Sequence, residues 1–228
     1  MANNKKKKSK LTIILLALVL LLPGFLYLTF VRVANNSYLT LPYYSTEGLT
    51  SGQVDLSSVY NIPDAKFQNL GGEDIVFNSD TTIRVFHLIS LGSPSYSRNI
   101  TDALEKVVDR FQTFNNLKFY SINVDTLAGF ADADDYILPY RDFFNKNWFY
   151  IQPSNEQAYG FIRDNLLLDV LYYSEFDTNV LPSNQIVLID KNGFLRGIYN
   201  SDNPKVYKII EEDIKVLLIE NLRGVQST

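Results

Sequence analysis

The fold follows from one stretch of sequence, Thr82-Ile83-Arg84-Val85-Phe86-His87-Leu88-Ile89-Ser90, which leads into Ser93-Pro94-Ser95-Tyr96-Ser97. The first part is nearly continuous in β-branched and apolar residues, which is typical of a strand buried on both faces. The second part opens a helix, since apolar residues recur at helical spacing from Ile100 to Phe111. We therefore expect the strand to be central in its sheet and the serines to lie in the loop where the helix starts.

The chain continues as alternating strands and helices. A second strand, Leu117 to Asp125, follows the helix, and a crossover of this kind predicts parallel strands with a right-handed connection. Later elements are a short helix near 138–145, a strand at 148–151, a helix from Ser154 to about Leu168 and a terminal helix after Asn203-Pro204. Hairpins are predicted around Gly71-Gly72 and Lys191-Asn192-Gly193. This order predicts one α/β, thioredoxin-like domain with a central mixed sheet over residues 61–228.

The N-terminal part has a different character. Residues 1–10 are basic, and an uncharged, leucine-rich run from Leu11 to Val31 follows them. At about 1.5 Å per residue this run matches a hydrocarbon core of about 30 Å, which predicts one transmembrane helix, an anchor at 11–33. The lysines before it place the N-terminus in the cytoplasm and the rest on the periplasmic, extracytoplasmic side of the inner membrane. A cleaved signal peptide is the alternative, but the run exceeds the usual apolar core of such peptides.

Residues 34–60 are rich in polar residues without a sustained period, and we interpret them as a partly ordered spacer. The chain has 21 Lys and Arg and 25 Asp and Glu, and six of the basic residues lie at or before Arg32. The exported part therefore carries a net charge of about −10, which disfavours nucleic acid and anionic lipid as partners.

The sequence contains no cysteine. Disulfide exchange, peroxide reduction by a thiolate and thiolate-bound copper all require that side chain, so this chain cannot perform them alone. No disulfide can cross-link the exported domain either, so its stability must come from a hydrophobic core.

Several short motifs are similar to those of one known family, the Sco/SenC proteins. The motifs are Ile62-Pro63-Asp64, Ile122-Asn123-Val124-Asp125, Trp148-Phe149, Leu188-Ile189-Asp190-Lys191-Asn192-Gly193 and Arg196-Gly197-Ile198-Tyr199. Sco/SenC proteins are membrane-anchored thioredoxin-like domains that help to load copper into cytochrome c oxidase. The likeness extends from about Ile62 to Asn221 and rests on order and spacing, and thiol oxidoreductases and peroxiredoxins share part of the last motif.

In the family, copper is bound by two cysteines of a C-P-x-x-C motif and by a later histidine. The resemblance places Ser93 and Ser97 on the cysteines and Pro182 on the histidine. Serine is a poor ligand for Cu(I) and proline has no side-chain donor, so we expect no metal and no cofactor at these positions.

The resulting hypothesis is a pseudo-enzyme without catalytic residues, which acts as a binding or assembly factor for a respiratory complex such as cytochrome oxidase, or for another envelope complex. Its expected partners are the membrane, through the single-pass anchor, and a protein of the cell envelope. One alternative is a copper or thiol function completed by a cysteine-bearing partner. Another is a degenerate relative of the thiol oxidoreductase and peroxiredoxin group, or an enzyme that uses serines or carboxylates.

Other polar residues have simpler interpretations. Ser95 or Ser97 is expected to cap the helix. The strand separates His87 from Ser93 by roughly 15–20 Å, which prevents a catalytic pair. For want of partners, we expect His87 in the core or in support of a site residue, and not as a metal ligand. An acidic group (Asp132, Asp134 and Asp135) and the stretch from Asp190 to Gly193 resemble calcium loops weakly, and we favour a solvated loop for the first and a hairpin turn for the second. The pairs Tyr43-Tyr44 and Tyr172-Tyr173 would suit a protein interface.

Overall fold

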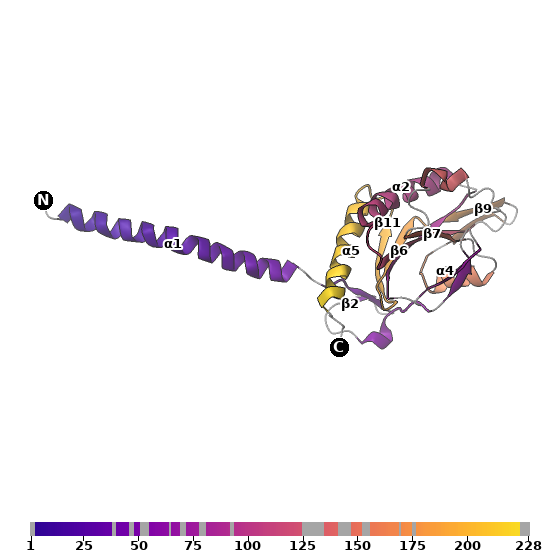
Figure 1. Ribbon diagram of the computed structural model, residues 1–228, viewed down its shortest axis with the longest axis horizontal. Helices are drawn as coiled ribbons and strands as arrows, with labels where there is room; N and C mark the ends of the chain where they lie inside the picture. The colour runs from indigo at the N-terminus through magenta and orange to yellow at the C-terminus, as the bar shows by residue number, and fades with distance from the viewer. Residues whose placement is uncertain are drawn as a thin grey trace. The chain divides into compact units, whose positions relative to one another are not determined.

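The computed structural model describes the chain as two units, Met1–Leu39 and Thr40–Thr228, which we treat separately (Figure 1). The residues described are 3–37, 40–45, 48–50, 55–63, 65–68, 72–77, 81–91, 94–124, 135–140, 147–151, 156–168, 170–174 and 177–223. The first unit is one helix, α1 (Asn3–Ser37), which contains Pro23. None of the helices, over the residues described, meets the length and apolarity required of a membrane span. The predicted anchor at 11–33 is therefore not confirmed.

The second unit contains a five-stranded mixed sheet in the order β11-β10-β5-β6-β7. Its strands are β5 (Ile83–Ile89), β6 (Leu117–Asn123), β7 (Trp148–Ile151), β10 (Gln185–Ile189) and β11 (Leu195–Asn200). β5, β6 and β7 are parallel, whereas β10 is antiparallel to both β5 and β11. The predicted central strand, mixed sheet and C-terminal hairpin are all confirmed.

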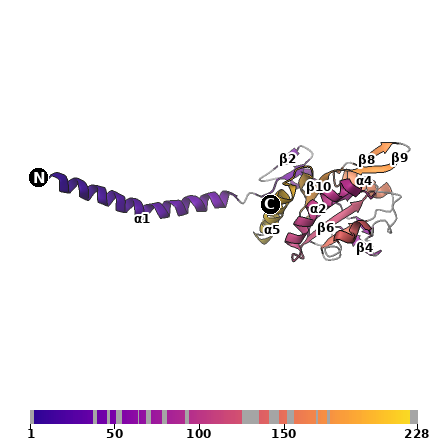
Figure 2. The ribbon, with the colours of Figure 1, turned by 90° about the horizontal axis from the view of Figure 1, so that it is seen from above.

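Three helices cover the two faces of the sheet (Figures 1 and 2). They are α2 (Pro94–Phe111), α4 (Glu156–Asp164) and α5 (Val206–Arg223). Residues of α2 and α5 pack with Val85 and Phe119 on one face. Residues of α4 pack with Phe86 and Tyr120 on the other. Because neighbouring residues of β5 and β6 point to opposite faces, both layers of the core depend on these strands being apolar throughout.

The smaller elements lie outside this sheet. The hairpin predicted around Gly71-Gly72 is present as β3 (Lys66–Gln68) and β4 (Asp74–Val76). A second hairpin, β8 (Val170–Ser174) with β9 (Asp177–Pro182), was not expected, because no glycine or proline punctuates the turn between its strands. Figure 2 shows it at one end of the globular unit. The short helix expected near 138–145 is described as a helical turn at 135–137 with η2 (Leu138–Tyr140), and 141–146 lie outside the described residues.

Part of the expected spacer contributes to the globular unit. Residues 34–37 belong to α1, and 40–60 supply β1 (Tyr43–Ser45), β2 (Gly48–Thr50) and η1 (Leu56–Ser58). Tyr43 and Val59 are buried. The apolar surface of these two side chains is therefore buried within the globular unit.

Candidate functional site

Ser97, which the resemblance places on the second family cysteine, lies inside α2. The helix begins at Pro94, whose fixed φ suits a first helical residue, so neither Ser95 nor Ser97 caps the helix, and that prediction was wrong. The Ser97 hydroxyl instead donates to the Ser90 carbonyl at 2.9 Å and accepts from the Ser90 N–H at 2.8 Å. Since Ser97 is fully buried, its hydroxyl ties the end of β5 to α2 and is not presented to a ligand.

Thr101 and Tyr136 make further hydrogen bonds next to Ser97. Thr101 Oγ1 donates to the Ser97 carbonyl at 2.9 Å. The Tyr136 hydroxyl oxygen lies 2.6 Å from Thr101 Oγ1, and because the Thr101 proton is already used, the Tyr136 hydroxyl is the donor in this second hydrogen bond. The guanidinium of Arg98 lies 5.1 Å from the centre of the Tyr136 ring. Burial raises the pKa of Tyr136 to about 12, so its phenol stays protonated at neutral pH.

Tyr140 makes a similar contact with the next residue of α2, Asp102. Its hydroxyl donates to Oδ1 of Asp102, and burial together with this hydrogen bond raises the pKa of Tyr140. Tyr136 and Tyr140 therefore hold residues 135–140 against α2. Leu138, between them, is 56 % exposed. Both tyrosines act as hydrogen-bond donors, not as ionised ligands.

The other two positions of the expected ligand set are Ser93 and Pro182. Ser93 lies outside the described residues. Pro182 is the last residue of β9, where it pairs with Val170. Among the residues described, no group of three or more histidine and carboxylate side chains could hold a metal ion.

A buried serine and histidine do lie within hydrogen-bond distance, but they are not the pair considered from the sequence. His87 Nε2 is 2.5 Å from Ser121 Oγ, and Ser121 also accepts from Trp148 Nε1 at 2.8 Å. The parallel register of β5 and β6 sets His87 opposite Ser121. The signal that could have revealed them is a polar residue at an equivalent place in two adjacent apolar strands.

This arrangement has the atoms of a nucleophile and a base, yet it has no access to a substrate. His87 and Trp148 are 0 % exposed and Ser121 is 1 % exposed. Burial lowers the pKa of His87 to about 3, so its imidazole is neutral at pH 7. The hydrogen bond between Nε2 and Ser121 is compatible with either neutral tautomer, and no partner for Nδ1 is seen among the described residues. We interpret the three residues as a polar bridge within the core.

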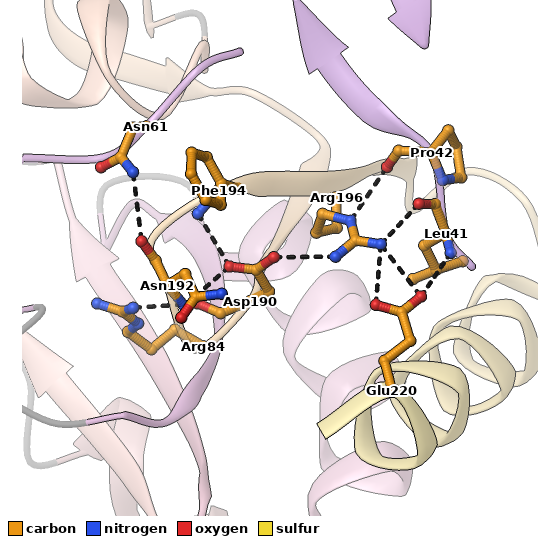
Figure 3. A network of polar contacts seen from close by, with 9 residues as sticks. All are labelled: Leu41, Pro42, Asn61, Arg84, Asp190, Asn192, Phe194, Arg196 and Glu220. Atoms are coloured by element: carbon orange, nitrogen blue, oxygen red, sulfur yellow. Dashed lines mark hydrogen bonds and ion pairs between the residues drawn. The ribbon is translucent and has the colours of Figure 1, made fainter. Parts of the chain in front are cut away.

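The most connected polar group is built on the motif from Asp190 to Tyr199 (Figure 3). Asp190 Oδ1 accepts from the N–H groups of Asn192 and Phe194 at 2.9 and 3.0 Å. These bonds shape the turn between β10 and β11 and explain the calcium-like sequence without a metal. The Asp190 carbonyl accepts from Nη2 of Arg84 at 3.1 Å, which attaches the turn to β5.

Arg196 lies at the centre of this network. Its Nη1 is 2.9 Å from Asp190 Oδ2 and its Nη2 is 3.0 Å from Glu220 Oε2 in α5. The Arg196 side chain is only 2 % exposed. Two carboxylates neutralise this buried cation, so the motif joins β11, the preceding turn and the C-terminal helix.

The remaining predicted residues divide into two groups. Asp132 and Asp134 lie outside the described residues, while Asp135 is exposed at the start of the turn that carries Tyr136.

Tyr43 packs edge-on against Phe194, with ring centres 5.7 Å apart, and Tyr44 accepts from the Ile198 N–H. Tyr43 is buried, so the interface prediction was wrong for this residue, whereas Tyr44 is only partly buried and the prediction for it is not tested. The side chains of Tyr172 and Tyr173 are not among those described.

Comparison with solved structures places this architecture in a known class. A SCO1/SenC family lipoprotein from Bacillus anthracis superimposes with a TM-score of 0.60 and 20% identity, over 70% of this chain and 95% of that chain. BsSco, described as a member of the Sco family of cytochrome c oxidase assembly proteins with a disulfide switch, gives 0.56 and 16% over 68% and 92%. Copper-bound ScoI of Bradyrhizobium japonicum gives 0.53 and 12% over 68% and 98%.

The globular unit thus has the thioredoxin-like fold of the Sco/SenC proteins, and the resemblance drawn from the motifs is confirmed at the level of the fold. Neither a family model nor a curated protein matches the sequence itself.

Proposed function

We propose that this protein is a membrane-anchored, Sco-like binding or assembly factor that works without copper or thiol chemistry. The single observation that carries the proposal is the state of Ser97. Ser97, which the resemblance places on a cysteine ligand of the family, has a buried hydroxyl, and both hydrogen bonds of this hydroxyl go to the backbone of Ser90. Such a side chain stabilises the fold and offers nothing to a soft metal ion.

The anchor and the location form part of the proposal. The apolar run from Leu11 to Val31, preceded by lysines, supports insertion in the inner membrane with the globular unit on the extracytoplasmic side. The partner class, a respiratory complex such as cytochrome oxidase or another envelope complex, is carried over from what BsSco is described as assembling.

The test combines genetics with metal analysis. In the native host, deletion of the gene is expected to reduce assembly of its target complex, measured by haem spectra of washed membranes and by native gel electrophoresis. A variant with Ser93→Ala and Ser97→Ala that still folds should restore assembly, and the purified full chain should retain no stoichiometric copper after desalting. Stoichiometric copper that is lost in the double variant would overturn the proposal and favour a metal role shared with a cysteine-bearing partner.

A further inference from the structure

Three aromatic side chains form a row inside the globular unit, next to α2. The ring centres of Tyr136 and Tyr140 are 6.1 Å apart, and those of Tyr140 and Trp148 are 5.8 Å apart. Tyr136 and Tyr140 are each 3 % exposed and Trp148 is 0 % exposed. Aromatic rings at such separations are in contact at their edges. An electron can therefore pass from one ring of the row to the next without an intervening group.

The protons of the three rings go to different acceptors. The Tyr140 hydroxyl donates to the carboxylate oxygen Oδ1 of Asp102. The Tyr136 hydroxyl donates to the hydroxyl of Thr101, and Trp148 Nε1 donates to the hydroxyl of Ser121 at 2.8 Å. A carboxylate can take up a proton, whereas a neutral hydroxyl is a very weak base. Of the three rings, Tyr140 is therefore the one whose described partner can accept its proton.

The charges around Asp102 favour this proton uptake. Asp102 is exposed, and Glu105 and Asp109 follow it on α2. Burial raises the pKa of Glu105, and the negative charges of Asp102 and Asp109 raise it further, so these carboxylates repel one another. A proton on Asp102 would relieve the repulsion.

Positive charge is less favourable at the two ends of the row. The guanidinium of Arg98 lies 5.1 Å from the centre of the Tyr136 ring and disfavours a second positive charge there. Beyond Ser121, the next group behind Trp148 is His87, and burial lowers the pKa of His87 to about 3, so this imidazole does not readily take a proton. A ring that loses an electron becomes a strong acid, so the oxidised state is most stable where the proton can leave. That place is Tyr140.

We propose that Trp148, Tyr140 and Asp102 form a one-electron relay, which transfers an oxidising equivalent from the buried indole to Tyr140 and holds it there as a neutral tyrosyl radical. The oxidant is of the peroxyl-radical class. It takes one electron from Trp148 and, with a proton from water, becomes a hydroperoxide. The indole radical cation then takes an electron from Tyr140, and the Tyr140 proton passes to Oδ1 of Asp102.

A soluble one-electron reductant of the ascorbate class completes the cycle. It returns an electron to the tyrosyl radical, the proton on Asp102 returns to the phenol, and the oxidised reductant releases the proton that replaces the one taken from water. The relay would protect Trp148, because a fully buried indole that gains oxygen atoms no longer fits a close-packed core. This inference does not depend on membrane anchoring or on the proposed function.

The experiment uses the single tryptophan of the full chain as the starting point. A laser pulse at a wavelength that indole absorbs and phenol does not ionises Trp148 in the presence of a soluble electron acceptor, and transient absorption follows both radicals. The indole radical should decay as a tyrosyl radical forms, at a rate independent of protein concentration and lower in heavy water. Tyr140→Phe should reduce the tyrosyl yield about tenfold or more. Asp102→Asn, which keeps an oxygen acceptor but removes the base, should slow the transfer about tenfold or more.

Two variants serve as matched controls. Tyr136→Phe removes a buried hydroxyl from the same segment, and Tyr199→Phe removes a phenol that donates to another carboxylate, Asp213, at 2.8 Å. Both should keep the rate and the yield of the wild type. An unchanged yield in Tyr140→Phe, or an equal loss in the controls, would overturn the inference. If Tyr140→Phe does not fold, Asp102→Asn at its exposed position decides, because an unchanged rate in that variant would overturn the inference equally.

The protective role has its own readout. After exposure of the full chain to peroxyl radicals from a thermal azo initiator, mass spectrometry should find oxidation at Tyr140 in the wild type and increased oxidation at Trp148 in Tyr140→Phe. Equal oxidation of Trp148 in the two proteins would show that the relay does not protect the indole.

Discussion

The hydroxyl of Ser97 makes hydrogen bonds with both backbone groups of Ser90, the N–H and the carbonyl. The two bonds connect the end of β5 with the first turn of α2.

Replacement of Ser97 by alanine tests that connection. Two buried hydrogen bonds are lost, and each contributes about 0.5–1.5 kcal/mol, so the free energy of unfolding should fall by about 1–3 kcal/mol. Urea unfolding of the globular unit within the full chain, followed by tryptophan fluorescence, measures the change. Ser95→Ala is the control, because Ser95 is exposed on the same helix and its removal should stay within about 0.5 kcal/mol. Equal effects of the two variants would show that the connection is unimportant.

The buried His87 should make stability depend on pH. Its pKa is about 3 in the folded protein and about 6.5 in an unfolded chain, so the unfolded state binds the proton first as pH falls. Stability is therefore complete above about pH 6.5 and falls below it, by up to about 1.4 kcal/mol per pH unit from this group.

The chain has one histidine, which makes the measurement clean. Between pH 6.5 and 5, where most carboxylates remain ionised, the wild type should lose stability more steeply than His87→Gln. The imidazole C2–H resonance of the folded protein should not titrate in this window. A resonance that moves with a midpoint near pH 6.5 would mean that the ring is solvated.

Regular elements were predictable from the sequence because their signals are local. The apolar run of β5, the Asn192-Gly193 turn and the spacing of apolar residues in α2 each act over a few residues, and all were placed correctly. The candidate site depended on contacts between distant segments. A polar residue in each of two apolar strands is the only local sign of the Ser121–His87 pair, and the pairing itself depends on the parallel register of β5 and β6.

The difference between local signals and contacts of distant segments also explains the wrong predictions near the candidate site. The start of α2 at Pro94 turned Ser97 from a cap into a buried residue whose partner precedes it by seven positions. The polar composition of 34–60 indicated a spacer, whereas Arg196, about 150 residues later, binds Leu41 and Pro42. Contacts between residues so far apart in the sequence are recognised only in the three-dimensional structure.

The charge network around Arg196 gives a prediction about stability. Arg196→Met removes the cation but leaves Asp190 and Glu220 nearly buried, so the free energy of unfolding should fall by about 3–5 kcal/mol. Lys215→Met, which breaks an exposed pair with Glu211 in α5, should cost less than about 1 kcal/mol. Similar costs for the two variants in urea unfolding would indicate that the network contributes no more than a surface ion pair.

The last prediction concerns Gly197, two residues before Tyr199 on β11. A Cβ at this position would overlap the hydroxyl end of the Tyr199 ring, which folds back over the glycine and donates to Asp213 Oδ2 at 2.8 Å. Gly197→Ala should therefore displace the ring and lower the free energy of unfolding by about 1–3 kcal/mol. In a Tyr199→Ala background the same change should cost little, so a double-mutant cycle should give a coupling of at least about 1 kcal/mol. Gly160→Ala in α4, where only Asp164 approaches at 4.0 Å, is the control and should stabilise the protein by about 0.5–1 kcal/mol. An additive cycle would show that the strand, and not Tyr199, requires glycine at position 197.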